Sequence, residues 1–186
     1  GKYPEVMHLP YPKVGTTNSA VRIGVTSSSR ARTLWLDDLP GDPRQNYIPR
    51  FAWADSSEEL VFQRMNRRQN HSTLWMAEVK SGKLNPFFEE KSDTWISVHN
   101  HMTWFEDGQA FLWQSEKEGW RRFYRVSRDG KSMTPITKGN YDVIQLVKFD
   151  IENGWLYFIA SPENPAQRYL FRERVDGTGT AEQLSP

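Results

Sequence analysis

A pattern of short apolar segments recurs every 45 to 51 residues, and this repeat constrains the fold of the 186-residue chain more than any other feature. Each unit begins with an apolar run that contains an aromatic residue, followed by an acidic turn and a second apolar run. The paired runs are 50–55 with 60–62, 102–105 with 110–113, and 146–150 with 155–158. The aromatic residues Trp53, Trp104 and Phe149 of the first runs are 51 and 45 residues apart.

The second half of each unit repeats as well. A third apolar run leads to a tight turn whose glycine is Gly82, Gly130 or Gly177, and these glycines are 48 and 47 residues apart. Glycine supplies the positive φ that such turns require. A short fourth strand is predicted after each turn, over 84–88, 133–137 and 181–184. Four short strands per unit are typical of β-propeller blades, and no apolar stripe at helical spacing persists beyond two turns.

The sequence therefore predicts an all-β fold, a partial β-propeller of about three and a half four-stranded antiparallel blades. The first unit is partial, because only 21–25 and 33–36 read as strands. The predicted blades are 11–40 (partial), 47–90, 100–138 and 143–185. The polar loops 37–46, 91–95 and 164–167 read as surface connections.

Composition excludes several classes of function. Eight tryptophans and 13% aromatic residues argue against disorder, and a net charge of +1 argues against a nucleic-acid partner. The absence of cysteine excludes disulfides and cysteine-ligated zinc. No apolar run is long enough for a membrane span, and no signal peptide opens the chain, which reads as a piece of a longer protein. No cofactor is expected.

Four segments occur in the order known from one family: Tyr11–Asn18 with 21–23, Gln63–Asn70, Ser115–Tyr124 and Ile136–Ile144. Together they resemble the propeller domain of the dipeptidyl peptidase IV family, within the prolyl oligopeptidases. The chain departs from the family pattern at Ser19 (usually proline), Arg122 (usually histidine) and Tyr141 (usually tryptophan). The resemblance covers nearly the whole chain.

The resemblance implies an eight-bladed propeller joined to a C-terminal α/β-hydrolase domain. It implies a periplasmic or extracellular serine exopeptidase that releases Xaa-Pro or Xaa-Ala dipeptides from peptide N-termini. The chain contains no Gly-x-Ser-x-Gly elbow, so we expect no catalytic residue in it. The family's glutamate pair, which holds the substrate's amino group, would precede Tyr11. A stand-alone propeller that binds a protein or a glycan is the alternative.

The segment between two blades contains the candidate substrate-facing residues. Positions 98–100 correspond to substrate-contacting positions of the family, so the resemblance makes His99 and Asn100 candidates for the substrate cavity, although the family's arginine is missing there. If this segment is a strand, His99 and His101 share one of its faces. A surface or interface pair is favoured over a metal site, because only Asp93 and Glu106 are nearby as further ligands.

The remaining charged and aromatic clusters have structural interpretations. Two glutamate pairs, Glu58-Glu59 and Glu89-Glu90, are expected to be solvated charges rather than substrate ligands. Five arginines flank aromatic residues and are expected to form ion pairs and cation–π contacts between blades, not to stack on bases: Arg64, Arg67, Arg68, Arg121 and Arg122. Five tryptophans at repeat positions are expected in the core: Trp53, Trp75, Trp104, Trp113 and Trp155.

An incomplete ring has a further consequence. Three and a half blades cannot close, so the two terminal blades would leave apolar faces uncovered. We therefore expect a homo-oligomer, with two copies facing each other.

Overall fold

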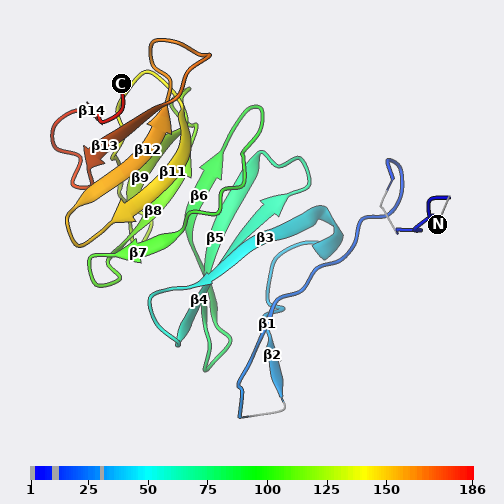
Figure 1. The fold of residues 1–186 in the computed structure, drawn as a ribbon. Coiled ribbons are helices and arrows are strands. Elements are labelled where there is room, and N and C mark those ends of the chain that lie inside the picture. The colour runs from blue at the N-terminus through cyan, green and yellow to red at the C-terminus, as the bar shows by residue number, and fades with distance from the viewer. Residues whose placement is uncertain (1–2, 10–12, 30–31) are drawn as a thin grey trace.

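The computed structural model describes residues 3–9, 13–29 and 32–186, and in these ranges the regular structure is almost entirely β-strand (Figure 1). Tyr11 and Pro12 of the first family segment lie outside the described residues. Within the described ranges, the model contains no helix that is long and apolar enough to cross a membrane.

The strands form a two-stranded hairpin followed by three four-stranded antiparallel sheets, each built from four consecutive strands. Blade 1 consists of β1 (Gly24–Thr26) and β2 (Thr33–Trp35), and the 3₁₀ turn η1 (Pro43–Gln45) leads to blade 2. Blade 2 contains β3 (Asn46–Trp53), β4 (Glu59–Asn66), β5 (His71–Glu78) and β6 (Leu84–Lys91). Blade 3 contains β7 (Thr103–Phe105), β8 (Ala110–Ser115), β9 (Arg122–Ser127) and β10 (Met133–Pro135). Blade 4 contains β11 (Val143–Asp150), β12 (Trp155–Ala160), β13 (Tyr169–Arg174) and β14 (Glu182–Gln183). The predicted all-β class with four-stranded antiparallel blades is confirmed.

Each blade packs face to face on the next, and one apolar core lies at each of the three contacts. All six residues of β8 are buried, because successive side chains of a strand point to opposite faces. Phe111 and Trp113 enter the core shared with blade 2, whereas Ala110 and Leu112 enter the core shared with blade 4. Strand β4 divides its apolar side chains between blades 1 and 3 in the same way. Blades 2 and 3 are thus walls shared by two cores.

The predicted turn glycines lie at equivalent positions in the three full blades. Gly82, Gly130 and Gly177 have φ values of 76°, 71° and 72°, in the left-handed region that glycine adopts without steric cost. Several strands differ from their predicted bounds: β10 and β14 are shorter than predicted, whereas β6 continues beyond Phe88 to Lys91, which pairs with His71 of β5. In β6 the apolar pattern ends before the strand does, because the backbone ladder does not depend on side-chain type.

Candidate functional site

A cleft of about 530 Å³ lies between blades 2 and 3, where β6 ends and β8 turns into β9. One wall is the connection from β6 to β7, and the other is the end of β8 with the turn 115–119. Two backbone hydrogen bonds hold the first wall on blade 2. The N–H of Ser92 donates to the carbonyl of Asn70 (2.9 Å), and that of Ile96 to the carbonyl of Gln69 (2.7 Å). Ile96 is buried, so this wall is anchored by packing as well.

Glu90, near the end of β6, lines the cleft and joins the two blades. Its carboxylate accepts hydrogen bonds from the indole Nε1 of Trp113 (2.9 Å) and from the hydroxyl of Ser115, both on β8. The same Ser115 hydroxyl accepts from the backbone N–H of Lys117 at 3.1 Å, which ties the turn to the strand end. The expectation that Glu90 is a solvated charge is therefore wrong, because this carboxylate is half-buried and used by the neighbouring blade.

His99 lines the cleft and Asn100 does not; Asn100 is exposed on the same connection. Burial, together with the positive charge of Arg121, lowers the pKa of His99 to about 4, and the charge of Glu116 opposes them. His99 is therefore a neutral imidazole at physiological pH, able to donate one hydrogen bond and accept one. Contact of His99 or Asn100 with a substrate stays a prediction.

The two histidines of this connection do not share a strand face, because residues 95–99 and 101–102 have no regular secondary structure and residue 100 is a bend. His101 instead packs its ring edge-on against Phe123, with centroids 5.9 Å apart, and burial lowers its pKa. The prediction of a common strand face is wrong because the connection crosses between sheets before β7 begins. Within residues 3–9, 13–29 and 32–186, no cluster of three His, Asp or Glu side chains is arranged to hold a metal ion.

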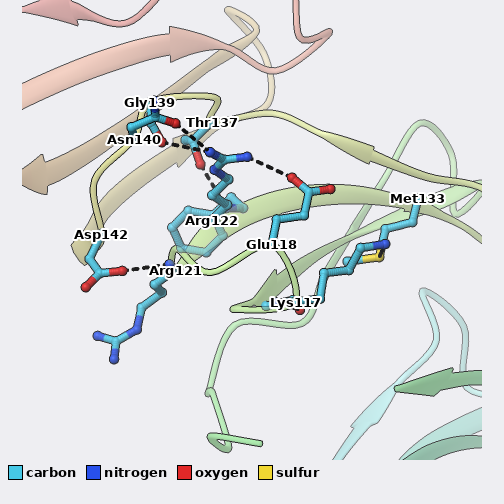
Figure 2. Close-up of polar contacts among 11 residues, drawn as sticks. Lys117, Glu118, Arg121, Arg122, Met133, Thr137, Gly139, Asn140 and Asp142 are labelled. Carbon is cyan, nitrogen blue, oxygen red and sulfur yellow. Dashed lines mark hydrogen bonds and ion pairs between the residues drawn. The ribbon is translucent and has the colours of Figure 1, made fainter. Parts of the chain in front are cut away.

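The hairpin turn between β8 and β9 is held by two adjacent arginines whose side chains point in opposite directions (Figure 2). Arg122 donates from Nη1 to Glu118 (2.7 Å) and from Nη2 to the carbonyl of Gly139 (3.1 Å). Arg121 donates from Nε to Glu116 at 2.9 Å. The turn is therefore attached both to itself and to the connection between β10 and β11.

Arg128, directly after β9, makes a second polar link between blades 2 and 3. Its guanidinium pairs with Glu59 of β4, donates to the carbonyl of Gly108 (2.8 Å) and lies 5.0 Å from the ring centre of Trp104. Glu59 is thus paired across the blade contact rather than solvated. Sequence reasoning missed Arg128, although it directly precedes a predicted Asp-Gly turn.

The five arginines singled out in the sequence behave differently from the expectation. Arg121 and Arg122 pair with glutamates of their own hairpin, and Arg64 donates to the carbonyl of Pro40. Arg67 and Arg68 are exposed in the turn after β4. The prediction of ion pairs between blades is wrong for this set. Arg121 and Arg122 lie on a tight hairpin that places glutamates of the same hairpin within ion-pair distance.

The five tryptophans predicted in the core differ in burial, and Trp75 is partly buried against the core between blades 1 and 2. Trp104 and Trp113 are buried between blades 2 and 3, as predicted. Trp53 is 50% exposed, because it faces blade 1, which has only two strands among the described residues. Trp155 is only partly buried and stacks with Arg172 and Arg174 on the face of blade 4 away from blade 3. The core prediction is therefore wrong for Trp53 and Trp155.

Stacked four-stranded blades with a cleft between them define this chain as a segment of a β-propeller. The sequence model described as the dipeptidyl peptidase IV (DPP IV) N-terminal region matches residues 1–186, and the chain belongs to this family.

Relatives and solved structures agree with this assignment. Inactive dipeptidyl peptidase 10 of Mus musculus is 29% identical over 94% of this chain and 23% of its own length. Probable dipeptidyl peptidase 4 of Emericella nidulans is 26% identical over 91% of this chain and 23% of its own length. The crystal structure of Porphyromonas gingivalis dipeptidyl peptidase 4 superimposes with a TM-score of 0.82 at 27% identity, over 94% of this chain and 24% of that one. The chain thus spans about a quarter of the length of the proteins it matches.

Proposed function

We propose that this chain is a non-catalytic propeller segment of a serine exopeptidase that releases Xaa-Pro or Xaa-Ala dipeptides from peptide N-termini. The similarity to Porphyromonas gingivalis dipeptidyl peptidase 4 over 94% of the chain supports this most directly. The chain has no Gly-x-Ser-x-Gly elbow. The nucleophile would therefore come from an α/β-hydrolase domain of the longer protein, and this segment would shape the substrate cavity and access to it.

The cleft between blades 2 and 3 is the part of this segment that we assign to the peptide. His99 offers a neutral donor and acceptor, and Asn100 offers an amide on the exposed side of the same connection. Both kinds of group match the alternating N–H and C=O groups of a peptide backbone. The anchored wall keeps them in place before a peptide arrives.

The test is dipeptide release by the full-length protein. Gly-Pro and Ala-Pro chromogenic anilides are compared with their N-acetylated forms, and a fluorophosphonate probe labels an active serine. We expect turnover of the free-amino substrates alone, together with covalent labelling. Turnover of the acetylated substrates, or labelling without dipeptide release, would contradict an exopeptidase of this kind.

A segment of a protein without peptidase activity is the second candidate. The similarity to a relative named inactive dipeptidyl peptidase 10 favours it. In that case the propeller would bind a protein or a glycan, as a stand-alone propeller would. No labelling and no turnover by the folded full-length protein would support this candidate.

The proposed setting is periplasmic or extracellular, and a homo-oligomer is part of the proposal. Phe51 and Trp53 of β3 lie on one strand face with exposed fractions of 68% and 50%. Burial of such a face favours self-association of the isolated 186-residue chain. Light scattering at micromolar concentration checks it, and a monomer of 21.8 kDa would contradict it.

A further inference from the structure

Arg121 follows the turn 115–119 that forms one wall of the cleft, although it does not itself line the cleft. Its positive charge acts on the imidazole of His99, and its Nε atom donates to Glu116, which lines the cleft. His99 is neutral, whereas Arg121 carries a positive charge close enough to affect it; Lys91 and Lys117 are the cationic residues among those that line the cleft. The side chain of Arg121 is 35% exposed, so the guanidinium is partly shielded yet reachable.

The backbone of Arg121 is held on both sides by the next blade connection. Its N–H donates to Oδ1 of Asp142 (2.7 Å, Figure 2), and its carbonyl accepts from the N–H of Val143 at 2.9 Å. Figure 2 shows its side chain pointing away from those of Arg122 and Glu118. A residue that is held in this way loses little conformational freedom on binding a ligand.

The donors of Arg121 are only partly used. Nε is taken by Glu116, and among the described residues neither Nη1 nor Nη2 has a hydrogen-bond partner. A guanidinium presents these donors in a planar fork that suits an oxygen acceptor. Glu116 and Glu90 add negative charge to the same cleft, which disfavours a carboxylate and favours a neutral carbonyl oxygen.

We infer that Arg121 is a substrate-binding residue, which donates from its terminal nitrogens to a backbone carbonyl oxygen of a peptide in the cleft. The inference rests on the proposed function, because that function supplies the peptide. Arg121 acts on binding and not on the chemical step, so its removal weakens the Michaelis complex and the transition state equally.

The experiment measures KM and kcat of the full-length protein with tetrapeptides, for Arg121→Ala, Arg121→Lys and the control Arg68→Ala. Loss of a charged hydrogen bond raises KM about ten- to a hundredfold in Arg121→Ala with kcat unchanged. Arg121→Lys recovers part of the affinity. Arg68→Ala removes an exposed charge from the turn after β4 and leaves both constants unchanged. A KM of Arg121→Ala within twofold of the wild type overturns the inference.

A further variant separates binding from a structural role. If Arg121 acted only through its pair with Glu116, then Glu116→Ala, which breaks that pair, would reproduce the change in KM of Arg121→Ala. We expect KM of Glu116→Ala within threefold of the wild type, since the guanidinium of Arg121 remains present to bind the peptide. An equal rise of KM in both variants overturns the inference.

Calorimetric binding of C-terminally amidated and free-acid tetrapeptides to the full-length protein completes the test. An equal loss of binding affinity for both peptides in Arg121→Ala supports a contact with a peptide carbonyl oxygen. A loss for the free acid alone assigns Arg121 to a carboxylate and overturns the inference. Arg121-dependent binding by a protein without turnover leaves the inference standing while the proposed peptidase activity fails. Absence of both binding and turnover rejects the two together.

Discussion

Blade 3 contacts blade 2 on one face and blade 4 on the other. Both contacts have an apolar core, but the carboxylates at the two contacts differ in their hydrogen bonds and ion pairs. At the first contact, Glu90 receives two donors from β8, and Glu59 pairs with Arg128. At the second contact, Glu173 of β13 is 1% exposed, and within the described ranges its Oε2 has no hydrogen-bond partner. One repeat thus produces two interfaces that both have an apolar core but differ in how their buried polar groups are paired.

The position along the strand accounts for the difference. Glu90 and Arg128 lie at or just beyond strand ends, where neighbouring side chains and turns offer partners. Glu173 lies inside β13, opposite Leu156 of β12. Burial raises the pKa of Glu173, and the positive charge of Lys138 partly offsets this rise. The pKa of the nearby Tyr141 hydroxyl is raised to about 12, chiefly by burial, with a contribution from the charge of Glu173. Apolar packing follows the repeat, whereas polar pairing depends on where in a strand the group falls.

Removal of one large ring from either core is the largest expected change. Phe111 at the first contact and Phe158 at the second are fully buried. Phe111→Ala and Phe158→Ala each lower the free energy of unfolding by about 3–5 kcal/mol through lost burial and a cavity. Chemical denaturation measures both. Phe51→Ala is the exposed control, and a difference of several kcal/mol between the two core variants would break the similarity of the cores.

A change of pH separates the two contacts. Burial raises the pKa of the Glu173 carboxyl to about 7 from 4.5. Between these two values the folded protein holds a proton that the unfolded chain releases, so the stability that this group contributes is highest below pH 4.5 and falls as pH rises to 7. The free energy of unfolding attributable to this group falls by about 3 kcal/mol over that window. Denaturation at several pH values measures it. Glu173→Gln removes this contribution, and an unchanged pH dependence in the variant would contradict the assignment.

The turn glycines probe how closely a hairpin approaches the neighbouring blade. A Cβ at Gly130 would lie 1.9 Å from the carbonyl oxygen of Phe87, whereas a Cβ at Gly177 would lie 3.1 Å from that of Pro135. We expect Gly130→Ala to cost more than about 2 kcal/mol, from left-handed strain plus the steric overlap. Gly177→Ala should lower the free energy of unfolding by less. A Cβ at Gly119 would have no other atom within 4 Å, so the effect of Gly119→Ala measures the backbone strain alone. Thermal unfolding ranks the three, and equal effects would show that the close approach at Gly130 is not rigid.

Removal of the polar bridge at the first contact is the smallest change. Glu90→Ala leaves the Trp113 indole N–H and the Ser115 hydroxyl without their acceptor, which costs about 1–3 kcal/mol. Glu89→Ala, its exposed neighbour paired with His71 and Lys91, costs at most about 1 kcal/mol. Urea denaturation compares them. A larger loss in Glu89→Ala would refute the role given to Glu90.

Period and turn chemistry predicted the blades, because each blade repeats the same apolar runs and the same glycine turn. The pattern placed Trp104 and Trp113 in the core for this reason. It failed for Trp53, whose exposure depends on what covers blade 2 and not on its own segment. Likewise, it could not pair Glu59 with Arg128, since 69 residues separate them and no local rule joins them. His99 was found through family resemblance alone, and its neutral state follows from burial that the sequence does not display.

The shared-wall arrangement of β8 carries a consequence for how such chains diverge. Deletion of a single residue inside this strand would rotate every following side chain to the opposite sheet face, exchanging the contents of two cores at once. A substitution disturbs one core, and a length change in a connection disturbs neither. Gaps between homologues are therefore expected to gather in the connections, while the central strands keep a constant residue count even where their residues differ.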